Sequence, residues 1–133
     1  MGNYLSRKNT PYVSKTVDEV VEEVVKSVMA GASIVHLHAK NPETGEAYLG
    51  DPNPVLKEYI ERICEWIDVV INVTTGGGRV GNPPEVWARL VNEKCLLGEE
   101  MMSLNMGTIN RWENYPTGDI LLNTVPMIER THA

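Results

Sequence analysis

The sequence predicts an α/β fold in which a small parallel sheet is covered by helices. Three amphipathic stretches alternate with three short, β-branched, apolar stretches along the 133 residues. This alternation is typical of parallel sheets, because parallel strands are joined by helical crossovers. Each apolar stretch also turns polar on one face towards its C-terminal end. Because a typical domain has about 150 residues, we expect one domain over residues 1–133.

The first predicted helix spans residues 16–30, TVDEVVEEVVKSVMA. Its valines recur with the i, i+3, i+4, i+7 spacing of one helix face. Thr16 and Glu19 form the pattern of a capping box, and Gly31 is a typical C-terminal stop. Valine has a modest helix propensity, so this helix depends on packing against a neighbour.

The remaining elements follow in order. A strand is predicted within residues 32–39, ASIVHLHA, and turn-forming residues come after it. A helix over residues 53–66 and a strand over 68–78 come next, followed by a helix over 84–95 with Pro84 in its first turn. The last strand is expected at 101–107, then a polar loop over 108–119 and the start of a further helix near the C-terminus.

The two faces of each predicted strand differ in chemistry, because alternate side chains point to opposite faces. One face is wholly apolar, and the other collects polar side chains near the strand ends. An open, doubly wound sheet needs two apolar faces, whereas a barrel has helices outside and its active site at the C-terminal mouth. The pattern therefore favours a barrel. The polar-face residues are His36, His38, Asn72, Thr74, Ser103 and Asn105, and the apolar ones Val35, Leu37, Ala39, Val69, Ile71, Val73, Met102, Leu104 and Met106.

Composition excludes several classes of function. The chain is 42% hydrophobic and 23% charged, with twelve basic and eighteen acidic side chains and a net charge of −6. An acidic balance argues against nucleic-acid and anionic-membrane partners. No apolar run approaches the ~20 residues of a membrane span, and the N-terminus lacks the apolar core of a signal peptide. Two cysteines without CxxC spacing fit a reducing cytoplasm, the expected location.

His36 and His38 form the first candidate site. Two imidazoles at i and i+2 share a strand face about 6.5–7 Å apart at the backbone. Both can reach one ion at the about 2.0–2.1 Å of zinc–nitrogen bonds, and a catalytic zinc has three protein ligands. The alternative is a hydrogen-bonded pair of interior histidines. The strand-end position favours the metal, although two histidines suit several transition metals.

Residues 74–78, TTGGG, form the second candidate site. Glycines permit close backbone approach, so exposed N–H groups can hold a carboxylate or phosphate. The segment has neither a GxGxxG pattern nor a Walker lysine. A flexible turn is the alternative, but the two threonine hydroxyls favour an anion-binding loop. Cys64 and Cys95 lie in helical patterns and are expected to be structural.

Three segments together resemble the β-keto acid cleavage enzyme family: GASIVHLHAKNPETGEAYLGDP, DVVINVTTGGG and EMMSLNMGTIN. The resemblance extends from about Asn9 to Arg130 and implies part of a TIM (β/α)8 barrel, about strands 2 to 4 with their helices. It implies zinc as cofactor, acetyl-CoA as co-substrate and a homo-oligomer. The implied reaction converts a β-keto acid and acetyl-CoA into acetoacetate and a new acyl-CoA.

The resemblance also assigns site residues. His36 and His38 match the zinc histidines, and Thr74, Gly77 and Ser103 match positions that hold the substrate carboxylate. Gly76 and Asn105 complete the expected substrate-binding set.

Other residues of the family site have no counterpart in this chain. An early strand with a catalytic-site glutamate precedes the matched part, and a glutamate zinc ligand, an arginine–aspartate pair and a further glutamate follow Ala133. A barrel typically has about 250 residues. The expected partners are therefore another copy or a complementing chain, besides the β-keto acid and acetyl-CoA. One alternative is a non-catalytic family remnant that self-associates through open strand edges. Another is a metal-dependent barrel hydrolase or aldolase.

Overall fold

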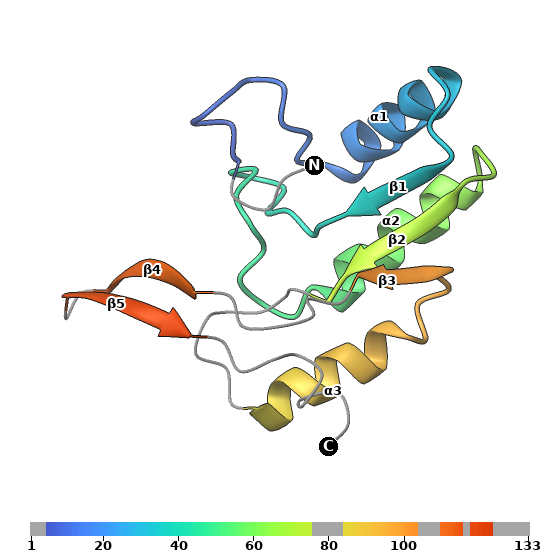
Figure 1. Cartoon of the computed structure of the whole chain (residues 1–133). Coiled ribbons are helices and arrows are strands. Elements are labelled where there is room, and N and C mark those ends of the chain that lie inside the picture. The colour runs from blue at the N-terminus through green and yellow to red at the C-terminus, as the bar shows by residue number, and fades with distance from the viewer. Residues whose placement is uncertain (1–4, 76–83, 104–109, 116–117, 124–133) are drawn as a thin grey trace.

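The computed structural model describes residues 5–75, 84–103, 110–115 and 118–123 of the chain. Helices and strands alternate as the sequence predicts, and the first three strands form a parallel sheet in the order β1-β2-β3 (Figure 1). The last two strands form a separate antiparallel pair. The elements are α1 (Val17–Met29), β1 (Ile34–Leu37), α2 (Asn53–Cys64), β2 (Val70–Thr74), α3 (Pro84–Lys94), β3 (Met101–Ser103), β4 (Asn110–Tyr115) and β5 (Gly118–Asn123).

The predicted capping box starts α1. The Glu19 backbone N–H donates to the Thr16 hydroxyl at 3.3 Å, and the Thr16 N–H donates to the Glu19 carboxylate at 3.4 Å. Two of the otherwise unpaired N–H groups of the helix terminus are thereby satisfied. At the other end, Gly31 has a φ of +106°, a left-handed conformation that glycine adopts without a steric penalty. Both predicted helix signals are confirmed.

The predicted apolar faces of the first two strands are buried, as expected. Val35 and Leu37 of β1 and Ile71 and Val73 of β2 are each 8% exposed or less. The strands pair in parallel, with Val35 opposite Ile71 and Leu37 opposite Val73. The register therefore presents one continuous apolar surface to the helices.

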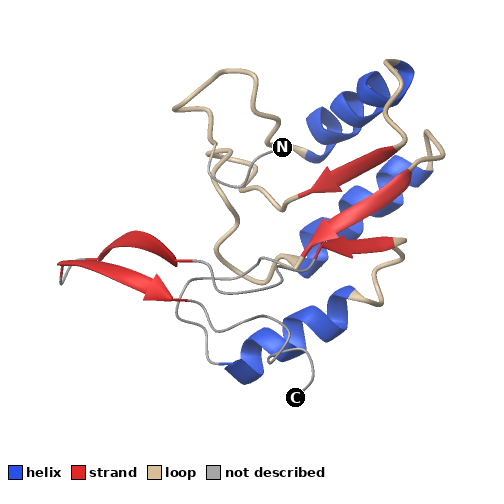
Figure 2. Cartoon of the chain, viewed as in Figure 1, coloured by secondary structure: helices blue, strands red, loops and turns tan. Residues whose placement is uncertain are grey.

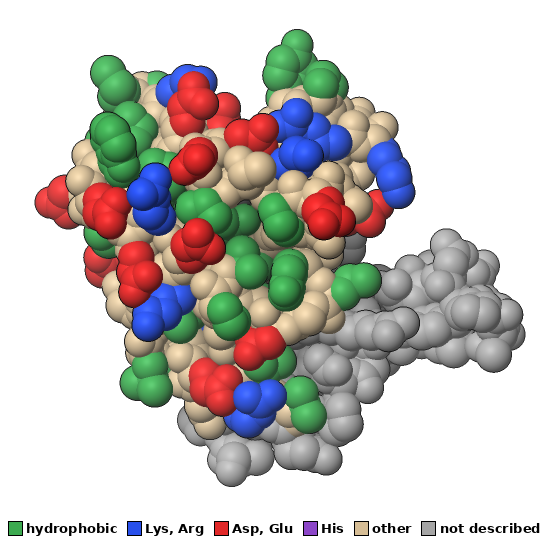
Figure 3. All heavy atoms as spheres, turned by 180° about the vertical axis from the view of Figure 1, so that it is seen from behind, with side chains coloured by type: hydrophobic (Ala, Val, Ile, Leu, Met, Phe, Trp, Pro, Cys, Tyr) green, Lys and Arg blue, Asp and Glu red, His purple; other side chains and the backbone are tan. Residues whose placement is uncertain are grey.

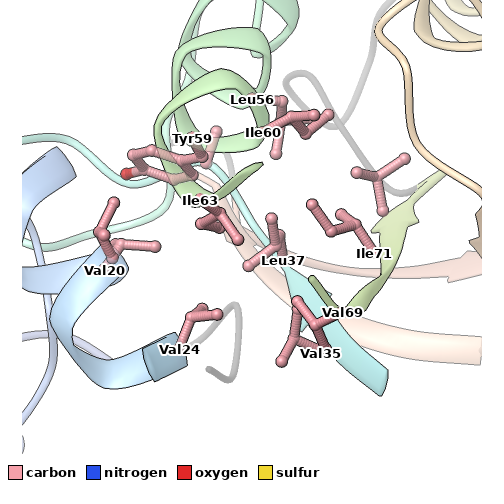
Figure 4. Close-up of a cluster of buried hydrophobic side chains, with 13 residues drawn as sticks. Val20, Val24, Val35, Leu37, Leu56, Tyr59, Ile60, Ile63, Val69 and Ile71 are labelled. Carbon is pink, nitrogen blue, oxygen red and sulfur yellow. The ribbon is translucent and has the colours of Figure 1, made fainter. Parts of the chain in front are cut away.

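The hydrophobic core lies between this surface and helices α1 and α2. Figures 1 and 2 show α2 behind β2 and α1 beside β1. Figure 4 shows Leu56, Ile60 and Ile63 of α2 directed at Leu37 and Ile71 of the sheet, with Val20 and Val24 of α1 beside them. Fully burying one such side chain contributes about 1.5–3 kcal/mol to folding. The core thus fixes β1 and β2, the strands that carry His36 and Thr74.

Two details differ from the sequence expectation. The predicted helix over residues 53–66 was expected to bury Cys64 and Trp66 on its apolar side, but both are exposed. The helix ends at Cys64, so the later residues leave the buried face. The expected loop contains β4, which pairs with β5 from Tyr115 opposite Gly118 to Asn110 opposite Asn123. The pairing partner of β4 is a later strand of the chain, and polarity along the chain does not reveal it. The expected further helix start beyond residue 123 lies outside the described residues.

The helix-covered side of the molecule carries mixed charges. Figure 3 shows it from behind the view of Figure 1, with acidic and basic side chains interspersed among hydrophobic ones and no histidine among the coloured residues. In the part of the chain that the structure describes, no helix combines the length and the apolar character needed to cross a membrane.

Candidate functional site

The candidate site lies on the sheet face that points away from helices α1 and α2. His36 is opposite Asn72 across the β1–β2 pair, and Thr74 is opposite Ser103 across the β2–β3 pair. Alternation along each strand brings these four residues to one face. His36 is exposed and Ser103 half-buried, so the face is accessible in this chain. The structure thereby gathers the predicted residues of three different strands.

The two predicted metal ligands converge. Their Nε2 atoms lie 3.1 Å apart, and the rings meet edge to face with centroids 4.7 Å apart. Two nitrogens bound to one tetrahedral ion at about 2.0–2.1 Å stand about 3.3 Å apart. The geometry accommodates a hydrogen bond between the rings or a shared ion. The metal site and the hydrogen-bonded histidine pair, the two alternatives predicted from the sequence, therefore correspond to the same arrangement of the rings.

His38 is held in the neutral form that metals bind. Burial of the ring, together with the neighbouring charge of His36, lowers the pKa of His38 to about 4. At neutral pH the ring carries no charge, and a lone pair is available on one nitrogen. In the described part of the chain, no group of three or more His, Cys, Asp or Glu side chains is placed to hold a metal. The two histidines fit two of the three protein ligands of a catalytic zinc.

Asn72 is a member of the site that sequence reasoning did not single out. Its Oδ1 lies 2.5 Å from Nδ1 of His36, the ring nitrogen on the side away from His38. The available signal was its place on the polar face of the second strand. That pattern shows the face of Asn72 but not the neighbour that it contacts.

The threonines at the end of β2 tie that strand to its neighbours. The Thr75 hydroxyl donates to the Ser103 carbonyl at 2.6 Å, and the Lys94 ammonium donates to the Thr74 carbonyl at 3.0 Å. Both threonines are buried. The backbone that leads into the predicted carboxylate loop is therefore anchored from β3 and from α3. The remaining predicted residues of the loop and of the third strand, Gly76, Gly77 and Asn105, lie outside the described residues.

Lys94 is a second site neighbour that the sequence pattern did not identify. It is 1% exposed, and burial lowers the pKa of its ammonium to about 8. Its spacing from Leu90, four residues before it on the buried face of α3, was the signal in the sequence. A lysine at a core-facing helix position has a structural or functional reason to be there, because lysine is almost never fully buried unless paired.

We expect Lys94 to make stability depend on pH. Its pKa is about 8 in the folded chain, against an ordinary value of 10.5. Between these values the unfolded chain binds more protons, so the free energy of unfolding rises with pH across this window and falls as pH drops towards 8. Urea unfolding from about pH 7 to 10.5 measures the rise, which should be smaller in a Lys94→Met variant, because the buried Lys40 also has a lowered pKa and keeps part of it.

Lys57 supplies the control for this experiment. It lies on α2 with its side chain 59% exposed. A Lys57→Met variant should keep the pH dependence of the unmodified chain. Parallel pH profiles for the Lys94→Met variant and the unmodified chain would contradict the burial of the ammonium as its cause.

The N-terminal segment holds the loop that follows His38. The Lys40 ammonium is fully buried and donates to the Leu5 carbonyl at 2.7 Å. Nearby, Lys8 forms an ion pair with Glu46 at 2.7 Å. Exposed ion pairs of this kind contribute little by themselves, about 0–1 kcal/mol. The buried lysine next to the histidine strand is therefore the stronger link between the two segments.

The amino-acid sequence is similar to that of one enzyme family. The family profile described as beta-keto acid cleavage enzyme matches residues 1–133. A 3,5-dioxohexanoate:acetyl-CoA acetone transferase of Paraburkholderia graminis is 35% identical over 101 residues, covering 76% of this chain and 31% of the relative. A 3-keto-5-aminohexanoate cleavage enzyme of Acetoanaerobium sticklandii is 32% identical over 127 residues, covering 96% and 42%.

A further relative is named for a related activity. A 3-dehydrocarnitine:acetyl-CoA trimethylamine transferase of Rhizobium meliloti is 30% identical over 142 residues, covering 92% of this chain and 44% of the relative. The chain thus spans less than half the length of these relatives. Since the family profile covers the whole chain and several relatives agree with it, this chain belongs to the beta-keto acid cleavage enzyme family.

Proposed function

We propose that this chain supplies the two-histidine metal site and the carboxylate-binding loop of a zinc-dependent β-keto acid cleavage enzyme. The proposed reaction is an acyl exchange, in which a β-keto acid and acetyl-CoA give acetoacetate and a new acyl-CoA. The observation that carries the proposal is the approach of the His36 and His38 Nε2 atoms to 3.1 Å. The acetyl-CoA transferase names of two relatives support the substrate class.

The histidines have the chemistry of a metal site. His36 and His38 would each direct Nε2 to the ion, and the low pKa of His38 keeps that ring neutral. Zinc bound there would act as a Lewis acid towards the keto oxygen of the substrate. A third ligand and the acid–base groups would come from outside the described residues, and we assign no catalytic acid or base within this chain.

The end of β2 would hold the substrate carboxylate. Hydroxyls of Thr74 and Ser103 and the backbone N–H groups of Gly76 and Gly77 are the proposed donors, with Asn105 beside them. The Thr75 hydrogen bond to Ser103 and the Lys94 hydrogen bond to Thr74 restrain the backbone of this loop. A fixed carboxylate orients the reacting carbon towards the thioester, and such positioning lowers the barrier.

The parallel sheet would be part of a (β/α)8 barrel, about its strands 2 to 4. The apolar side chains of Ile34, Val70 and Met101 are 52%, 36% and 44% exposed on the same face as His36. In a barrel this face lines the lumen, where such side chains are packed in layers. We propose that a homo-oligomer or a complementing chain completes the barrel around these strands, and that the assembly works in the cytoplasm.

The exposed side chains of Ile34, Val70 and Met101 also support a second candidate function, that of a non-catalytic family member that self-associates. In the described residues, β1 and β3 each pair with β2 only. Strands with an unpaired edge are templates for pairing with another chain. Under this alternative, a dimer would form without metal and without turnover.

A single purified preparation of this chain tests the proposal. We expect bound zinc by elemental analysis and, in an assembly that completes the site, acetyl exchange between labelled acetyl-CoA and a β-keto acid such as 3,5-dioxohexanoate, followed by mass spectrometry. Sedimentation velocity gives the oligomeric state. A metal-free chain without exchange contradicts the enzyme proposal, and a metal-free dimer supports self-association. Turnover of simple carboxylates without CoA esters would instead indicate a hydrolase or aldolase.

A further inference from the structure

We infer that Asn72 is a positioning residue that sets the tautomer of His36, so that His38 alone changes tautomer when both rings bind an ion. The first half concerns the metal-free chain. The second half rests on the metal role proposed above. The two halves are separately measurable. The ring proton of each histidine is observable without any metal, and the spectrum with added metal then tests the second half.

The contact between Asn72 and His36 decides which ring nitrogen of His36 carries a proton. The two residues are direct cross-strand partners, and Asn72 Oδ1 lies 2.5 Å from His36 Nδ1. An amide oxygen only accepts hydrogen bonds, so the imidazole N–H must be at Nδ1. In a neutral ring the lone pair is then at Nε2, the nitrogen that faces His38. Asn72 therefore presets His36 as a donor to a metal.

The contact between the rings then decides the tautomer of His38. The two Nε2 atoms are 3.1 Å apart, within hydrogen-bond distance. Because His36 Nε2 holds a lone pair, His38 Nε2 must donate, and it carries the proton in the metal-free chain. A lone pair remains at Nδ1 of His38. The metal-free pair is thus asymmetric, with His36 protonated at Nδ1 and His38 at Nε2.

Binding of an ion between the rings removes this asymmetry. Both Nε2 atoms must then offer a lone pair, so His38 gives up its Nε2 proton and takes one at Nδ1 through solvent. The ring stays neutral, and no proton is released by either histidine. His36 keeps its proton and its orientation. Outer hydrogen bonds of this kind hold metal-binding histidines, and their loss typically weakens metal affinity about 10–100-fold.

Imidazole ¹⁵N–¹H correlation spectra of the labelled full chain test the inference directly. The measurement is made at about pH 8, above the ordinary histidine pKa of about 6.5. Without metal, we expect His36 protonated at Nδ1 and His38 at Nε2. With added Zn²⁺, we expect both rings protonated at Nδ1. An Nε2 proton on His36 in the metal-free chain would overturn the inference.

Substitutions at Asn72 separate positioning from a structural role. Asn72→Leu removes the acceptor, whereas Asn72→Asp keeps an oxygen for Nδ1. We expect the leucine variant to lose the single tautomer of His36 and to bind Zn²⁺ about 10–100-fold more weakly, and the aspartate variant to restore both. Asn92→Leu, at an exposed position of α3, is the matched control.

The outcomes distinguish this inference from the proposed function. If the unmodified chain has the expected tautomers but binds no Zn²⁺, the metal role fails and the Asn72 contact stands. If Zn²⁺ binds and Asn72→Leu changes neither the tautomer nor the affinity, the inference fails and the metal role stands. Urea unfolding of each variant shows whether the fold is retained, and a leucine variant that unfolds is replaced by Asn72→Ala.

Discussion

Replacing His36 and His38 together by alanine is expected to abolish zinc binding by this chain. The two Nε2 atoms lie 3.1 Å apart, so each ring supplies half of the nitrogen donors at the candidate site. Loss of both first ligands should weaken binding beyond the about 10–100-fold effect of losing an outer partner. Titration with Co²⁺, read by its visible absorption, and elemental analysis for zinc measure the loss.

An exposed polar residue of α3 provides the matched control. An Asn92→Ala variant leaves the candidate site residues unchanged, and it should bind metal as the unmodified chain does. The single variants His36→Ala and His38→Ala should each lose most of the affinity, since one ring cannot chelate. Full metal occupancy in the double variant would place the metal elsewhere and remove the basis of the proposed function.

Replacing Leu56 by alanine is expected to cost about 2–5 kcal/mol of unfolding free energy. Leu56 is fully buried in the core between α2 and the sheet. The substitution removes apolar contacts and leaves a cavity that a close-packed interior fills only in part. Because domains are stable by about 5–15 kcal/mol, this loss is a large share of the total. Urea unfolding followed by circular dichroism measures it.

Leu96 offers the same substitution at an exposed position. Its side chain is 84% exposed just after α3, so Leu96→Ala should change the unfolding free energy by less than about 0.5 kcal/mol. The difference between the two variants isolates burial from the chemistry of the leucine side chain. Equal destabilisation by both substitutions would contradict the packing of α2 against the sheet.

Much of the sheet and its helices was predictable, because local patterns carry the information. The capping pattern of Thr16 and Glu19 and the stop at Gly31 gave the limits of α1 to within a residue or so. Alternation along the strands identified Val35 and Ile71 as core residues, since a strand can bury only every second side chain on one face. The antiparallel pairing of β4 and β5 was not predicted, because strand pairing depends on both strands and not on the pattern within one of them.

The candidate site was predictable only in part. Residue type and strand position are enough to select His36, His38 and Thr74 from the amino-acid sequence. The hydrogen bonds of Asn72 to His36 and of Lys94 to the Thr74 carbonyl depend on which residues are in contact across strands and between α3 and the sheet. These contacts follow from strand register and helix packing, which are set by residues far apart in the sequence.

By itself, the sequence determined the order of helices and strands, the face of each strand that is buried, and the residue types gathered at the strand ends. These properties follow from periods of two and of about 3.6 residues, which are local to the chain. Only the tertiary structure decided that the His36 ring meets both Asn72 and His38, and that a buried lysine reaches the Thr74 carbonyl. The physical reason is that core packing sets the register of β1 on β2, and register sets every distance between side chains on neighbouring strands.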